Sequence, residues 1–398
     1  MYSSTENSIV DMVISQNIRN ISENELEDIK NNCESTLNTS SNKEELIKAN
    51  YILAFIKIMN SDNKDAIIYL ENARKLFDKH TEKKLKIWIN YTLSEAYLYE
   101  EKYEKSDERF NEAVNICETG YNKETLIELY RKGSSNKLRF PDGFSKSIEL
   151  AEKSLELSKA INYEVVESYW KASVIHAVSG NNIQSIEYQL AAIELAKEQG
   201  SADLEMKNRV ELAINYLDLE NYEEAIKYLK ESLTYTSGDE GKDAYYKSYA
   251  LVNLIESYIK VGNLEEASNS IGDLEGIIAK IEQKKMKDDT VILMYLLKAK
   301  MNLKNQNLIE AKRLLDISAK RYEENINDFR YVDFDIYLSD TYGDIYYDRA
   351  QYDKSLEFHK ASEALAKEGG VSTMKLHMLK IYILIMKLLK IMKMQIFI

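Results

Sequence analysis

The chain has 398 residues, of which 44% are hydrophobic and 30% are charged, and its formal net charge is −13. One proline and 13 glycines are too few for collagen-like or disordered Pro/Gly-rich proteins, or for β-rich folds with many tight turns. The excess of acids repels nucleic acid and anionic membrane surfaces. Two cysteines, no signal-like N-terminus and no run of about 18 uncharged apolar residues leave a helical cytoplasmic protein without an integral membrane segment.

Residues 1–42 are predicted to form N-terminal capping helices over 8–20 and 22–37. The second begins at Ser22, and Glu25 stands three residues later, which is the spacing of a capping box. A DNA-reading helix-turn-helix would need a basic recognition helix, whereas this segment is acidic. The pair is therefore expected to shield the first unit of the array that follows.

Residues 43–370 contain a repeated pattern: a helix, a short polar turn, an aromatic or Leu, then acids and a small residue. It is clear over 94–106, 213–225, 255–267 and 343–355. The small residue recurs every 38 to 44 positions, at Ala66, Ser106, Ser147, Ser185, Ala225, Ala267, Ala311 and Ser355. Twelve residues before it stand Ala54, Ser94, Ser135, Ser173, Ala213, Ile255, Ala299 and Gly343, and seven after it Ala73, Ala113, Ser154, Ala192, Ser232, Leu274, Ser318 and Ser362.

Small side chains at fixed offsets indicate close packing of paired helices. Two antiparallel helices joined by a short turn approach closely only where the facing side chains are small. Aromatic residues three positions after the first small residue, such as Tyr97 and Tyr216, fill the space beside that contact.

These columns, with the turn at 262–267, resemble tetratricopeptide repeats. The resemblance implies an all-α, right-handed α-solenoid of about eight hairpins. The mean period near 41 exceeds the usual value of about 34, which implies helices about one turn longer. The proline that ends helix B in that family is absent, since the one proline is Pro141.

Three internal segments are expected to interrupt the array. The stretch from Gly133 to Phe144 predicts an irregular linker after a weak helix A, and 237–242 and 284–289 predict loops between repeats. After the array, 371–398 is rich in Lys, Ile, Leu and Met, and no acid occurs from Lys375 onward. This tail is interpreted as a C-terminal helix, with three alternatives: a basic amphipathic helix that caps the array or touches a membrane, a plain capping helix, or the product of truncation or a shifted reading frame.

No pattern in the sequence predicts catalysis, a metal or a cofactor. The four histidines lack a second His or Cys at ligand spacing, and no phosphate loop, zinc motif or nucleophile elbow is present. Paired acids such as Glu223 and Glu224 recur at the first turn of helix B, where negative charge favours the helix N-terminus.

Binding is the function that the resemblance implies, in the groove lined by the first helix of each hairpin. Donors and aromatic rings at groove positions form the candidate site, which is Trp88, Lys171, Lys207, Tyr249 and Asn253. Amides can pair with a peptide backbone, lysines with acids and rings with apolar anchors. The competing interpretation is that these are solvated groove residues.

The resemblance points to bacterial signalling receptors and sensors. The first hypothesis is a non-enzymatic scaffold or sensor that binds a protein or short peptide in the groove. The alternative is the sensor region of a signalling enzyme, a nucleotide cyclase such as a diguanylate cyclase or a kinase, whose catalytic domain is absent from this chain. A peptide-gated transcription regulator would need a DNA-binding domain, which the sequence does not show.

Overall fold

The computed structural model describes residues 9–13, 22–236, 238–282, 284–325 and 334–368. These residues are helical, with short connections and no strand among them, as the sequence predicts. The chain divides into two compact units, 1–168 and 169–398. The division falls within α9 (Val165–Val178). The tail predicted over 371–398 lies outside the described residues.

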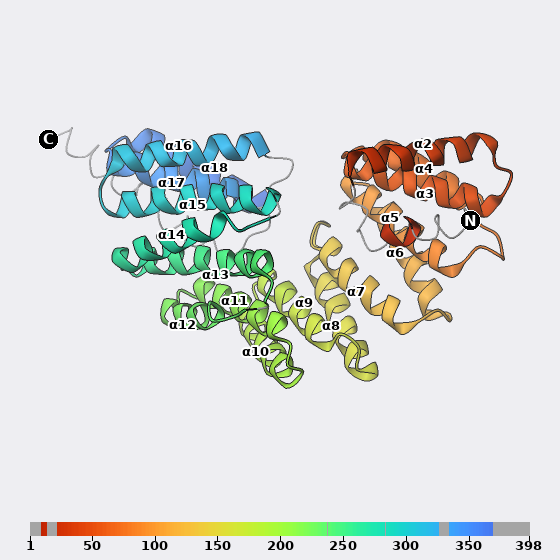
Figure 1. Cartoon of the computed structure of the whole chain (residues 1–398), viewed down its shortest axis with the longest axis horizontal. Helices are drawn as coiled ribbons and strands as arrows, with labels where there is room; N and C mark the ends of the chain where they lie inside the picture. The colour runs from red at the N-terminus through yellow and green to blue at the C-terminus, as the bar shows by residue number, and fades with distance from the viewer. Residues whose placement is uncertain (1–8, 14–21, 237, 283, 326–333, 369–398) are drawn as a thin grey trace. The chain divides into compact units, whose positions relative to one another are not determined.

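The first unit stacks hairpins in chain order (Figure 1). Its pairs are α3 with α4, α5 with α6 and α7 with α8, and each pair contacts the next through α4 and α5 or α6 and α7. Its helices are α2 (Glu23–Thr39), α3 (Lys43–Met59), α4 (Asn63–Lys75), α5 (Lys83–Tyr99), α6 (Tyr103–Glu118), α7 (Lys123–Lys137) and α8 (Phe144–Ile161).

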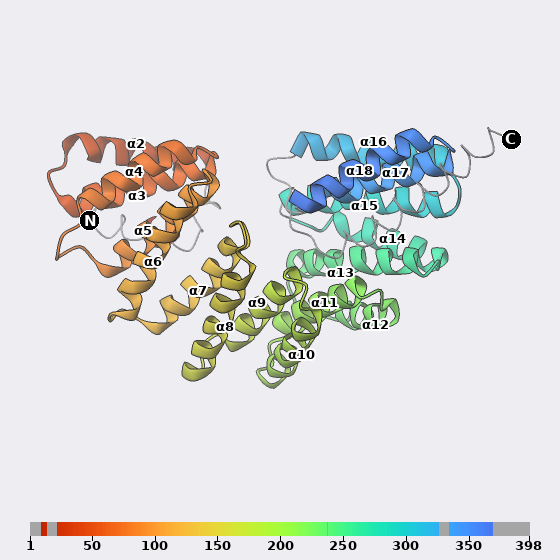
Figure 2. The ribbon, with the colours of Figure 1, turned by 180° about the vertical axis from the view of Figure 1, so that it is seen from behind.

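The second unit repeats this arrangement (Figure 2). The pairs α11 with α12, α13 with α14, α15 with α16 and α17 with α18 follow one another, and α13 also contacts α15. Its helices after α9 are α10 (Asn182–Glu198), α11 (Ala202–Asp218), α12 (Tyr222–Ser232), α13 (Glu240–Lys260), α14 (Leu264–Ile278), α15 (Lys284–Lys304), α16 (Leu308–Asn325), α17 (Phe334–Asp348) and α18 (Tyr352–Glu368).

The column of small residues lies where the paired helices meet. All eight of its members are at most 1% exposed. In the second hairpin the Ser106 hydroxyl donates to the Ser94 carbonyl oxygen at 2.8 Å, and the hydroxyl oxygens of Ser173 and Ser185 lie 2.9 Å apart in a later one. These distances leave no room for a longer side chain, so the small residues set how closely the helices approach.

Serines seven residues further along also bond across the pair. The hydroxyl of Ser318 on α16 donates to the carbonyl oxygen of Ile292 on α15 at 2.7 Å, and that of Ser362 on α18 donates to Ile336 on α17 at 3.0 Å. Each hydroxyl satisfies its own hydrogen-bonding need in a buried position. Serine at this contact therefore costs little relative to alanine.

The structure corrects the prediction for the third hairpin. α7 is a full helix that Asn122 caps, and it continues through Gly133 to Lys137 instead of giving way to a linker at Gly133. The small partner of Ser147 is Ser134, whose carbonyl oxygen accepts its hydroxyl at 2.5 Å, and not Ser135. Gly133 does not face the groove, because an added Cβ would lie 2.2 Å from the Phe110 ring.

Two further expectations concern helix ends. The capping box at α2 is confirmed, since the amide of Glu25 donates to the Ser22 hydroxyl and the amide of Ser22 donates to Glu25. The loop predicted over 284–289 is wrong, because α15 begins at Lys284. Residues 9–13 are helical, and Val10 and Val13 are buried in the core of the first unit. The role of 1–42 as a cap stays a prediction.

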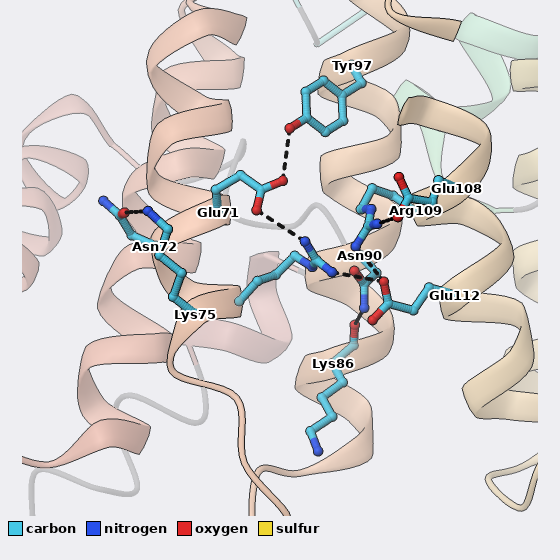
Figure 3. Close-up of polar contacts among 10 residues, drawn as sticks. Glu71, Asn72, Lys75, Lys86, Asn90, Tyr97, Glu108, Arg109 and Glu112 are labelled. Carbon is cyan, nitrogen blue, oxygen red and sulfur yellow. Dashed lines mark hydrogen bonds and ion pairs between the residues drawn. The ribbon is translucent and has the colours of Figure 1, made fainter. Parts of the chain in front are cut away.

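An ion network joins the second helices of two successive hairpins in the first unit (Figure 3). Arg74 on α4 pairs with Glu71 at 3.1 Å and with Glu112 on α6 at 3.0 Å, and Glu112 also pairs with Arg109 at 2.6 Å. From α5, the Tyr97 hydroxyl donates to Glu71 at 2.9 Å. Burial and the Glu71 carboxylate together raise the pKa of Tyr97 to about 12.

Removing the shared carboxylate of this network is expected to destabilise the first unit. Glu112→Ala leaves Arg109, whose side chain is 9% exposed, with one fewer partner, and we expect a loss of about 1–2 kcal/mol because Glu112 itself is partly exposed. Glu108→Ala is the matched control: it also removes a partner of Arg109, but its own side chain is 66% exposed, so about 0.5 kcal/mol or less is expected. Urea unfolding measures the stability of both variants. Equal losses would contradict the stabilising role of Glu112 in this network.

Candidate functional site

The second unit holds a cavity of about 400 Å³. Four successive first helices line it: α9, α11, α13 and α15. Its walls are mainly aromatic and apolar and carry a few charged groups, which is the composition of pockets that bind ligands. The lining residues are Trp170, Met206, Lys207, Val210, Glu211, Tyr245, Tyr246, Ser248, Tyr249, Val252, Met286, Asp289 and Thr290.

Trp170 and Lys207 form one wall of the cavity, and Lys171 lies beside the Trp170 ring without lining the cavity. The Lys207 ammonium lies 3.3 Å from the centroid of the Trp170 ring, and the Lys171 ammonium lies 5.0 Å from it. A cation at this position is attracted by the negative face of the indole ring. The predicted residues Lys171 and Lys207 therefore come together, on α9 and α11.

Glu211 is the half-buried acid of the cavity, one turn after Lys207 on α11. The Tyr249 hydroxyl donates to its carboxylate at 3.5 Å. Burial raises the pKa of Glu211, against the opposing effects of Lys207, Trp170 and Tyr249. The cavity thus offers a protonatable carboxyl group beside a cation and aromatic rings.

The far wall comes from α13 and α15. The rings of Tyr245 and Tyr246 contact each other with centroids 5.4 Å apart. The Ser248 hydroxyl donates to the carbonyl oxygen of Tyr245 on its own helix at 2.7 Å. The Thr290 hydroxyl donates to the carbonyl oxygen of Met286 on its own helix at 2.8 Å. Because these hydroxyls already bond within their own helices, the tyrosine rings are the main groups that this wall offers to a ligand. Asp289, which is 5% exposed, is a buried acid in the same wall.

The other two predicted residues lie elsewhere. The Asn253 side-chain amide donates to the carbonyl oxygen of Tyr249 on its own helix at 2.9 Å, and Asn253 does not line the cavity. Trp88 belongs to the first unit, is 4% exposed and packs edge-on against Tyr91 with centroids 5.7 Å apart. Its indole is a core group rather than a groove group.

Several lining residues were not among the predicted ones. Trp170 directly precedes Lys171, and its place in the wall follows from the rotation of α9, which repeat spacing fixes only to within a residue. Met286 and Asp289 fall within the loop predicted over 284–289, which the structure shows to be the start of α15, so sequence reasoning did not place them on a helix. Glu211 occupies a groove position, but acids at helix surfaces are common in this chain and gave no separate signal.

The described residues form neither a membrane-spanning helix nor a metal-binding cluster. None of their helices is both long and apolar enough to cross a bilayer. No group of three or more His, Cys, Asp or Glu residues among them is arranged to hold a metal ion.

Comparison with known proteins gives matches in structure only. No family model matches the chain, and no curated protein matches its sequence. The apo form of RapI superposes with a TM-score of 0.62 at 16% identity, over 92% of this chain and 97% of RapI. Aspartyl phosphate phosphatase F of Bacillus subtilis gives 0.57 at 14%, over 94% and 97%.

Two more structures extend the comparison. A Rap protein complexed with competence and sporulation factor gives a TM-score of 0.54 at 13% identity, over 92% of this chain and 98% of that one. A signal-transduction ATPase of Pyrococcus horikoshii with a tetratricopeptide repeat sensor gives 0.52 at 20%, and this chain spans 44% of its length. These superpositions show the fold: the described part of the chain is a helical array of tetratricopeptide-type hairpins.

Proposed function

We propose that this chain is a regulator in bacterial signalling that binds a short peptide, or an extended segment of a partner protein, in the cavity of the second unit. The observation that carries the proposal is the cavity itself, built by four successive first helices. A cavity of this volume lies within the range of ligand pockets and is too small for a folded domain.

The chemistry of the walls supports a peptide. Aromatic rings from Trp170, Tyr245 and Tyr246 suit apolar side chains, while Lys207 and Glu211 can pair with charged side chains or termini. The fold is also that of a Rap protein solved in complex with competence and sporulation factor. Lys207 and Tyr249 are the predicted residues that line the cavity, and we assign them to the ligand site together with Lys171, which lies beside the Trp170 ring.

We further propose that the chain acts by binding rather than by catalysis, in the cytoplasm. The competing proposal, a sensor region that belongs to a signalling enzyme such as a cyclase or kinase, is favoured by the likeness to the ATPase with a repeat sensor. Because one solved structure of this fold is an aspartyl phosphate phosphatase, the purified chain is also to be assayed for hydrolysis of an aspartyl phosphate. We expect no turnover.

Calorimetric titration with a library of synthetic short peptides tests the binding proposal. We expect at least one sequence to bind, and Trp170→Ala or Lys207→Ala to weaken it by about ten- to hundredfold, as loss of a central anchor does. Lys230→Ala is the matched control, since its ammonium lies 5.6 Å from the Tyr258 ring but outside the cavity. Peptides that bind equally well to all three variants would place the site elsewhere.

A further inference from the structure

A buried histidine in the last described hairpin lies between two aspartates. His359 on α18 is 2% exposed. Its Nδ1 lies 3.0 Å from Oδ1 of Asp340, and its Nε2 lies 3.7 Å from Oδ1 of Asp344. The first distance is a hydrogen bond, while the second is too long for one. Both aspartates belong to α17, one turn apart.

The backbone of α17 is shaped to admit this ring. Gly343 lies between the two aspartates, and a Cβ there would be 2.6 Å from Cε1 of His359. Asp340 and Asp344 are four residues apart and share one face of the helix. The glycine therefore lets the imidazole reach the helix surface with a carboxylate on either side.

Other charged groups surround the cluster. Lys300 on α15 pairs with Glu256 on α13 at 3.0 Å, and its ammonium lies 4.9 Å from the Tyr337 ring of α17. Lys300 also acts on Asp344 electrostatically, as does Asp348 at the end of α17. On α16, Asp316 accepts the Tyr342 hydroxyl, and the charged neighbours of His359 on its own helix are Glu357, Lys360 and Glu363.

The protonation state of the ring decides to how many carboxylates it can donate a hydrogen bond. A charged imidazole donates from both nitrogens, so it can bond Asp340 and still present an N–H toward Asp344. A neutral imidazole donates from one nitrogen only, which leaves the second aspartate next to a lone pair and close to another carboxylate. Because the ring itself is buried, with its side chain 1% exposed, a lone pair that faces a carboxylate costs more there than it would in water.

The ionisation of Asp344 adds an effect of the same sign. Burial and, next, the Asp340 charge raise its pKa to about 6, against the opposing effects of His359 and Lys300. An unfolded aspartate releases its proton near 4, so between about pH 4 and 6 the folded chain holds a proton that the unfolded chain has lost. Stability therefore falls as pH rises through this window.

We propose that Asp340, His359 and Asp344 form a proton-operated clamp that holds α17 against α18 when it is protonated and loosens this hairpin when it is not. The proposal does not depend on a ligand in the cavity. It makes the last described hairpin of the array the part whose local stability responds to pH between mildly acidic and neutral conditions.

Hydrogen exchange of the full chain, followed by mass spectrometry at pH 5 and pH 7.5, tests the clamp. After correction for the intrinsic exchange rates, peptides from α17 and α18 should be about tenfold more protected at pH 5, the equivalent of one pKa unit. Peptides from α10 and α12 in the same sample should show no such change. His359→Asn should reduce the difference in α17 and α18 and leave only the part that Asp344 contributes.

Two variants separate the clamp from a general loss of folding. Asp344→Asn changes a side chain that is 45% exposed and should fold normally while reducing the pH effect. His176→Asn removes another buried histidine, whose ring contacts Asn181 and Tyr188, and should leave the pH effect intact. A pH effect that persists undiminished in both His359→Asn and Asp344→Asn, or one spread evenly over all helices, would overturn the proposal.

Discussion

Gly133→Ala is expected to lower the free energy of unfolding of the first unit by about 2 kcal/mol, the cost of overpacking a filled core. The sign is the informative part, because helix propensity alone predicts that Ala in place of a helical Gly stabilises by about 0.5–1 kcal/mol. The added methyl group would lie 2.2 Å from Cζ of Phe110, which is 4% exposed. Because the Phe110 ring is buried among close-packed neighbours, we expect α6 and α7 to separate.

The chain supplies matched controls for this substitution. Gly272 and Gly276 lie on α14, and a Cβ at either position would meet nothing within 4 Å. Gly272→Ala and Gly276→Ala should therefore stabilise, or at least not destabilise, the protein. Urea titration measures the free energy of unfolding of all three variants. Phe110→Leu combined with Gly133→Ala should recover part of the loss by vacating the ring's place. If Gly133→Ala behaves like Gly272→Ala, the close contact of α6 with α7 is wrong.

Ser106→Leu is expected to destabilise the first unit by about 3 kcal/mol, at the upper end of overpacking costs. The Ser106 side chain is 1% exposed, and its hydroxyl oxygen lies 2.8 Å from the Ser94 carbonyl oxygen and 3.1 Å from the Ser94 hydroxyl. A leucine cannot fit between α5 and α6 without moving one helix. Because each hairpin is held by its neighbours, the shift should spread to the adjacent pairs.

Ser106→Ala separates crowding from the loss of the hydrogen bond. It keeps a small side chain and removes one buried hydroxyl, so a loss of about 1 kcal/mol is expected. Thermal unfolding followed by circular dichroism measures both variants. Similar losses for Ala and Leu would mean that the hydrogen bond, and not the approach of the helices, sets the requirement for a small residue at this position.

The sequence predicts the hairpin architecture because that architecture is a local and repeated property. A small residue every 38 to 44 positions marks each contact between paired helices, and the structure buries every one of them. Ser22 and Glu25 likewise predict the start of α2, since a capping box involves residues only three positions apart. Such signals depend on neighbours along the chain, which the sequence lists directly.

The errors arise where tertiary contacts overrode local preference. The stretch from Gly133 onward predicted a break in the helix, yet α7 continues to Lys137. Gly133 packs against the Phe110 ring, and the Ser134 carbonyl oxygen accepts the Ser147 hydroxyl. α15 begins five residues before the predicted loop ends, and it brings Asp289 into the cavity wall. A segment with only a weak local preference for coil becomes helical when packing against neighbouring helices stabilises the helical form.

By itself, the sequence determined the helical class and the number and spacing of the hairpins, because small-residue columns and polar turns repeat along the chain, whereas the groove lined by first helices was implied by the resemblance to tetratricopeptide repeats. Only the tertiary structure decided which groove residues meet. Lys207 reaches Trp170 on another helix, and His359 reaches Asp340 and Asp344 across a hairpin. These contacts depend on helix rotation and on side-chain direction to within a residue, which a period of about 41 residues does not specify.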